Sequence, residues 1–132
     1  MAKKSPPSLL CLCSSGKPYA ECCRPWHHGS PAPSAETLMR SRYTAYVLKL
    51  ESYLLQTWHP ETRPASLDLA EDRQTKWLGL EVKRCQSTGE NTAVVEFVAR
   101  YKVSGKAEQL HEISNFIKVD KKWYYINGKL SL

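Results

Sequence analysis

Four of the five cysteines lie close together near the start of the chain. They follow the spacing C-x-C-x8-C-C and are Cys11, Cys13, Cys22 and Cys23. The surrounding residues are rich in proline, serine and glycine, and such a segment cannot build a hydrophobic core unaided. A reducing compartment keeps thiols free, and four thiolates match the tetrahedral preference of zinc. We therefore predict that one zinc ion orders residues 1–30.

Four protein ligands would close the coordination sphere, so this zinc is expected to be structural rather than catalytic. Gly16 and Pro18 turn the chain back between the two cysteine pairs. Two alternatives stay open. The thiols could form disulfides or remain free of metal, or His27 or His28 could replace Cys23 as the fourth ligand, because adjacent cysteines strain a chelate.

Helical periodicity follows the cysteine segment, after a proline-containing stretch over 26–33 that is expected to be a loop. Helices are predicted over 35–50, 51–57 and 66–79. Ser34 is a good N-cap for the first of them. The apolar side of that helix is formed by Leu38, Met39, Tyr43, Tyr46, Val47 and Leu50. The third helix is irregular, with Trp77 as its expected anchor.

After Gly79 the apolar residues alternate with a period of two, which predicts strands. The expected strands cover residues 80–85, 92–103, 107–119 and 123–126. Cys85 stands alone in the first of them and is expected to be a buried small hydrophobe. Helices followed by an antiparallel meander indicate an α+β fold, in which the helices cover one face of the sheet.

The cysteine segment resembles the SEC-C motif, a small zinc-binding element known from the C-terminus of the preprotein translocase ATPase. The resemblance covers the four cysteines together with Ser15, Gly16, Lys17 and Tyr19. Leu12 and Ser14 depart from the motif, which usually has Pro and Gly at these positions. Neither position supplies a metal ligand.

The rest of the chain resembles the YchJ-like family. The resemblance rests on the patterns LMRSRYTAYV from Leu38, YLxxTWHP from Tyr53, HExSxF from His111 and WxY from Trp123. It implies a nuclear transport factor 2-like, cystatin-like cone over residues 34–132, after a SEC-C element over 1–30. It also implies a biochemical role that is uncharacterised.

Cones of this fold often enclose a cavity between sheet and helices. Glu112 and Ser114 share one face of their strand, and Arg42, Trp58 and His59 could meet them at its mouth. Such a group could bind a small ligand or perform acid–base chemistry. The interpretation that we favour is that Arg42 and Glu112 form a buried, hydrogen-bonded pair that fixes the helix on the sheet, and that His59 caps a loop. We find no nucleophile elbow, phosphate loop or catalytic metal spacing, so binding is favoured over catalysis.

The basic and aromatic side chains of the zinc element suggest a surface for a protein or a ribosome, formed by Lys17, Tyr19 and Arg24. The net charge of +6 makes nucleic acid a further candidate partner, supported by charge alone. No apolar stretch approaches the roughly 20 residues that cross a bilayer, and the first residues do not resemble a secretory signal. We therefore expect a cytoplasmic protein that makes no contact with membranes.

Overall fold

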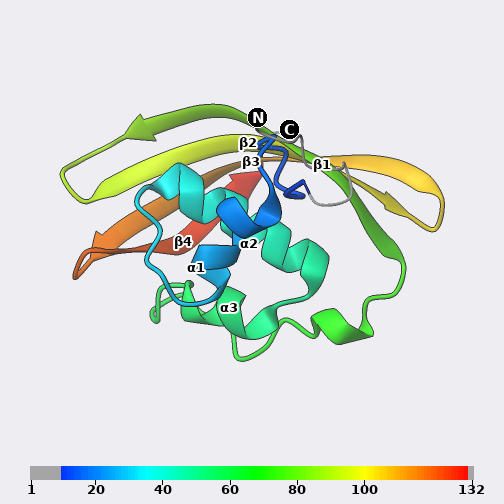
Figure 1. The fold of residues 1–132 in the computed structure, drawn as a ribbon, viewed down its shortest axis with the longest axis horizontal. Coiled ribbons are helices and arrows are strands. Elements are labelled where there is room, and N and C mark those ends of the chain that lie inside the picture. The colour runs from blue at the N-terminus through cyan, green and yellow to red at the C-terminus, as the bar shows by residue number, and fades with distance from the viewer. Residues whose placement is uncertain (1–9, 131–132) are drawn as a thin grey trace, which may run out of the picture.

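The computed structural model describes residues 10–130. Short helical elements come first, and four strands follow (Figure 1). The helices are α1 (Arg24–His27), α2 (Ala35–Leu48) and α3 (Glu51–Gln56), with 3-10 turns at Tyr19–Glu21 and Leu69–Glu71. The strands are β1 (Thr75–Ser87), β2 (Thr92–Val103), β3 (Lys106–Val119) and β4 (Lys122–Leu130). The predicted α+β fold class is thereby confirmed.

The four strands form an antiparallel meander in the order β1-β2-β3-β4. The sheet is long and curved, and the helices lie against one of its faces (Figure 1). On β2 the predicted alternation is seen, since Ala93, Val95, Phe97 and Ala99 are all buried. Among the described helices, none is long and apolar enough to cross a membrane.

The central helix α2 begins and ends where local chemistry requires. The Ser34 hydroxyl accepts a hydrogen bond from the Thr37 amide at 3.1 Å, which caps the first turn. Lys49 adopts a left-handed conformation with φ of 59° and ends the helix. Ser41 and Thr44 are fully buried, although they do not lie on the predicted apolar side. The helix is therefore covered on two sides, by the sheet and by the N-terminal segment.

The third helix predicted over 66–79 is wrong. Only the 3-10 turn near its start is helical, and β1 begins at Thr75. The Asp72 carboxylate accepts hydrogen bonds from the amides of Gln74 and Thr75 at 3.1 Å each, which turns the chain into the strand. Trp77 anchors β1 instead, with its ring 5.8 Å from that of Tyr43.

Two smaller expectations also need correction. The segment 26–33 is not wholly a loop, because α1 includes Trp26 and His27. Helix α1 tolerates Pro25 because this residue lies in its first turn, where the amide has no partner within the helix and its absence costs little. Cys85 is exposed rather than buried, as are all the residues from Lys83 to Ser87 in the second half of β1.

We expect Leu54→Ala to lower the free energy of unfolding by about 2–5 kcal/mol. Leu54 is the one residue of α3 that is fully buried, so its removal leaves a cavity. Urea unfolding followed by circular dichroism measures the change. Leu48→Ala is the matched control, since Leu48 is 43% exposed and its loss should change stability by less than about 0.5 kcal/mol. Equal effects of the two substitutions would contradict this account of α3.

Candidate metal centre and cavity

The four cysteines of the N-terminal segment converge on one point. Their sulfur atoms all lie within 4.8 Å of one another. The sulfurs of Cys13 and Cys22 are 3.5 Å apart, and those of Cys22 and Cys23 are 3.9 Å apart. A tetrahedral centre with metal–sulfur bonds of about 2.3 Å has edges of about 3.8 Å. The four cysteines could therefore bind a metal ion.

A tight loop brings the two cysteine pairs together. The Cys11 amide donates to the Lys17 carbonyl at 2.8 Å, and Gly16 has a φ of 83°, a conformation that glycine adopts easily. Ser14 has a φ of 68°, and this is the position at which the SEC-C motif usually has glycine. Its hydroxyl accepts a hydrogen bond from the Leu80 amide of β1 at 3.3 Å. The serine thus ties the loop to the sheet.

Side chains around the sulfurs hold the cluster against α2. The Thr44 hydroxyl donates to Cys23 at 3.5 Å and lies 3.6 Å from the sulfur of Cys11. Arg40, one turn earlier, donates to the Cys13 carbonyl at 2.8 Å. Cys11, Cys13 and Cys23 are buried in the same core as the sheet residues. The cysteine segment is therefore packed into the molecule and is not a separate appendage.

Hydrogen bonds with Cys11 and Cys23 lower the pKa of the Cys13 thiol, whereas the pKa values of its two neighbours in the cluster are raised. Burial raises the pKa of the Cys22 thiol to about 11. Hydrogen bonds with Cys11 and Cys13, together with burial, raise the pKa of the Cys23 thiol. A bound cation would offset the repulsion between thiolates, and its binding would release their protons.

His27 is engaged away from the sulfurs. Its Nε2 donates to the Ser41 carbonyl at 2.7 Å, so its Nδ1 is free to accept from the Tyr19 hydroxyl, also at 2.7 Å. Burial lowers the pKa of His27, which favours the neutral ring that this pattern requires. Lys17 and Arg24 are exposed, whereas Tyr19 is half-buried beside His27. His28 is exposed and lies outside the sulfur cluster.

A cavity of about 260 Å³ lies between α2 and the covered face of the sheet. Arg42 from α2 and Glu112 from β3 both line it. The predicted ion pair between these two residues is wrong, since no contact within 4.0 Å joins charged atoms of Arg42 and Glu112. Arg42 instead donates from Nη1 to the Leu54 carbonyl and to the Thr57 hydroxyl, at 2.7 Å each.

The other residues predicted for this pocket, Trp58, His59 and Ser114, do not line the cavity. The Trp58 ring nevertheless lies 5.1 Å from the Arg42 guanidinium carbon. Ser114 is fully buried and donates its hydroxyl hydrogen to Glu112. His59 lies outside, where its Nδ1 accepts from the Glu61 amide at 3.2 Å, as expected for a loop cap.

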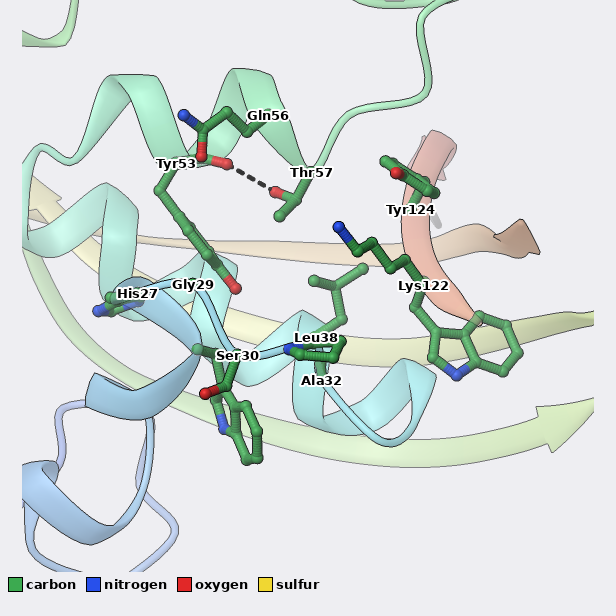
Figure 2. A pocket seen from close by; sticks show the side chains of 13 residues that line it. His27, Gly29, Ser30, Ala32, Leu38, Tyr53, Gln56, Thr57, Lys122 and Tyr124 are labelled. Carbon is green, nitrogen blue, oxygen red and sulfur yellow. Dashed lines mark hydrogen bonds between the residues drawn. The ribbon is translucent and has the colours of Figure 1, made fainter. Parts of the chain in front are cut away.

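A second, smaller cleft of about 150 Å³ lies where the cysteine segment meets the cone (Figure 2). Trp26 and His27 contribute from α1, Tyr53 and Thr57 from α3 and its end, and Lys122 from β4. Figure 2 shows the Lys122 side chain extending between α3 and α2. The sequence gives no sign of this cleft, because its walls come from three segments far apart along the chain.

These features define a class of protein, in which a SEC-C-type cysteine element is packed on a nuclear transport factor 2-like cone. A family model described as YchJ, middle NTF2-like domain, matches residues 34–128. The chain belongs to this YchJ-like family, whose curated members carry the designation UPF0225. A UPF0225 protein of Chromobacterium violaceum is 53% identical, with 97% of this chain and 98% of that protein covered. A UPF0225 protein of Bordetella parapertussis is 49% identical, with 96% and 98% covered.

Solved structures support the same assignment. A SEC-C motif containing protein from Rhodopseudomonas palustris has a TM-score of 0.83 and 36% identity, over 92% of this chain and 98% of that one. A SEC-C motif containing protein from Psychrobacter arcticus has a TM-score of 0.75 and 30% identity, over 94% and 82%. An NTF2-like protein of unknown function from Prochlorococcus marinus, with a TM-score of 0.50 and 17% identity over 74% and 92%, shares the fold alone.

We expect Thr44→Val to weaken metal binding by about tenfold or more, because the valine keeps the shape but removes the hydroxyl that contacts two sulfurs. Competition with a chromophoric chelator measures the affinity. Ser41→Ala is the control, since Ser41 is equally buried on α2 but bonds Leu38 and Tyr53 instead of the cysteines. If both variants bind metal as the wild type does, Thr44 has no part in the site.

Proposed function

We propose that the cysteine cluster binds one zinc ion and that this ion is structural. The observation that carries the proposal is the convergence of four sulfurs within 4.8 Å, with three of the four cysteines buried. Zinc favours a tetrahedron of thiolates, and a sphere closed by four protein ligands leaves no position for substrate. The density of free thiols also suits a reducing compartment, and we place the protein in the cytoplasm.

The role of the ion follows from what the segment contacts. The segment reaches α2 through Arg40, Ser41 and Thr44, and β1 through the Leu80 amide. It has too few apolar side chains of its own to hold this shape. Zinc binding would supply the missing folding energy, and would thereby complete the cover over the central helix.

Replacing all four cluster cysteines by serine should remove zinc, from about one ion per chain to none. We expect hydrogen exchange to become fast across residues 10–29 and faster within α2, whereas β2 and β3 keep their protection because they are paired on both sides. Cys85→Ser is the control, since its exposed thiol is not in the cluster. Unchanged protection of residues 10–29 in the metal-free variant would refute the structural role.

We also propose that the zinc element presents a surface to a partner protein or ribosome. Lys17 and Arg24 support this, since both are exposed basic side chains on the segment that the metal would make rigid. Tyr19 would hold that surface in place and would not contact the partner itself, because its hydroxyl is hydrogen-bonded to His27. Nucleic acid remains a weaker candidate that rests on the net charge of +6.

Lys17→Glu combined with Arg24→Glu should reduce recovery of partners in a pull-down, because the reversed charges would repel an acidic surface. Lys106→Glu is the matched control. Lys106 is a basic residue whose side chain is 82% exposed, and it lies at the start of β3, in the hairpin at one end of the sheet (Figure 1). Quantitative mass spectrometry compares the three samples. Identical partner sets in all of them would remove the support for this surface.

A second function, binding of a small ligand within the cone, is favoured by a specific observation. The cavity between α2 and the sheet is open, and it is lined by two residues of opposite charge that do not pair with each other. Buried charges normally pair directly, since desolvation makes an isolated charge costly. Arg42 and Glu112 both line the cavity without a direct ion pair between them, and this arrangement suits a ligand that contacts both.

A further inference from the structure

The cone cavity is apolar except at one end. Its walls include the rings of Tyr43, Tyr46, Trp77, Phe97 and Tyr125, together with Leu110. Aromatic walls of this kind favour a flat, largely apolar ligand. The volume of about 260 Å³ lies just below the range typical of drug-sized ligands, so the occupant is small.

Arg42 brings hydrogen-bond donors to this cavity. The residue is only 4% exposed, and both hydrogens of Nη1 are used by the Leu54 carbonyl and the Thr57 hydroxyl. Its guanidinium carbon lies 5.1 Å from the Trp58 ring and 4.6 Å from the Tyr125 ring, which fixes its position. A further hydrogen bond joins the guanidinium to the Tyr46 hydroxyl, which also lines the cavity. The N–H groups that these three acceptors leave are available to a ligand.

Glu112 brings an acceptor. Its Oε2 accepts from the Ser114 hydroxyl, and its Oε1 forms no hydrogen bond within the described part of the chain. The carboxylate lies directly over Gly128 of β4. A Cβ at that position would approach Oε2 to 2.2 Å, so only glycine there leaves room for this orientation. No lysine or arginine nitrogen between residues 10 and 130 comes within 4.0 Å of the carboxylate.

Each of the two charged residues disfavours ligands of its own sign of charge. A carboxylate ligand that reached Arg42 would meet the negative charge of Glu112, and an ammonium ligand that reached Glu112 would meet the guanidinium. A like charge held in such a site is unfavourable, which is one way in which proteins achieve specificity. A neutral amide satisfies both groups, because its carbonyl accepts from Arg42 while its N–H donates to Glu112.

From this geometry, we propose that the cone cavity binds a small, neutral, planar ring compound that carries an amide or lactam group. The aromatic walls hold the ring, and the polar end aligns the amide between Arg42 and Glu112. This inference rests on the ligand-binding function proposed above and narrows it to one chemical class.

Three probes that share one ring test the class, namely benzamide, benzoate and the benzylammonium ion. Titration of the full-length protein at about millimolar probe, followed by two-dimensional NMR, should shift amides of the cavity residues. We expect benzamide to bind about tenfold more tightly than either charged probe, since each charged probe leaves Arg42 or Glu112 without a suitable partner.

Glu112→Gln supplies the decisive variant, because it removes the charge and keeps the shape. Benzoate should then gain about tenfold relative to benzamide, which brings the two probes to similar affinities. A purely structural role for Glu112 would not produce this change in selectivity. Gly128→Ala is the second variant. It displaces the Glu112 carboxylate by steric contact and should also reduce the preference for benzamide.

Leu110→Trp serves as the blocking control, since Leu110 is half-buried on the cavity wall and a larger ring there should abolish binding of every probe. Thermal unfolding verifies that each variant is folded. Equal binding of the three probes, or tightest binding of a charged one, would overturn the amide class and leave cavity binding intact. No shift at the cavity with any probe would overturn both.

Discussion

The contact between the Thr44 hydroxyl and two cysteine sulfurs is the interaction on which the rest of the structure depends. It lies where the cysteine segment covers α2, on the side turned away from the sheet. Without the segment, the fully buried Ser41 and Thr44 would face water. Without α2, the segment would have no apolar surface against which to fold. Each part therefore completes the other, and a metal ion held by the sulfurs would strengthen that mutual support.

The same helix carries the cavity on its other side. Residues 42 and 44 are two positions apart, which places them about 200° apart around a helix. Thr44 thus faces the sulfurs while Arg42 faces the sheet and lines the cavity. The position of Arg42 is set in turn by α3 and by the rings of Trp58 and Tyr125. One helix therefore carries contacts both to the cysteine cluster and to the cavity.

Local signals predicted most of the elements, and failures occurred where those signals were mixed. The Ser34 cap and the alternation along β2 were sufficient because each depends on neighbouring residues alone. The segment 66–79 combines charges with scattered apolar residues, and such a pattern does not separate an irregular helix from a turn followed by an exposed strand. The Asp72 turn decides that case. The sequence also predicted that Arg42 and Glu112 lie at one cavity. It did not predict that they stay unpaired, because Arg42 instead donates to acceptors that α3 and its end provide.

By itself the sequence determined the cysteine cluster, the α+β order of elements and the sheet face that is buried. Spacing and periodicity suffice for these, because each concerns residues that are close along the chain. Only the tertiary structure decided that the cysteine segment packs on α2, that His27 bonds Ser41 and Tyr19, and that a cleft opens between α1, α3 and β4 (Figure 2). These features join segments that are distant in sequence, and their geometry is set by how whole elements pack against one another.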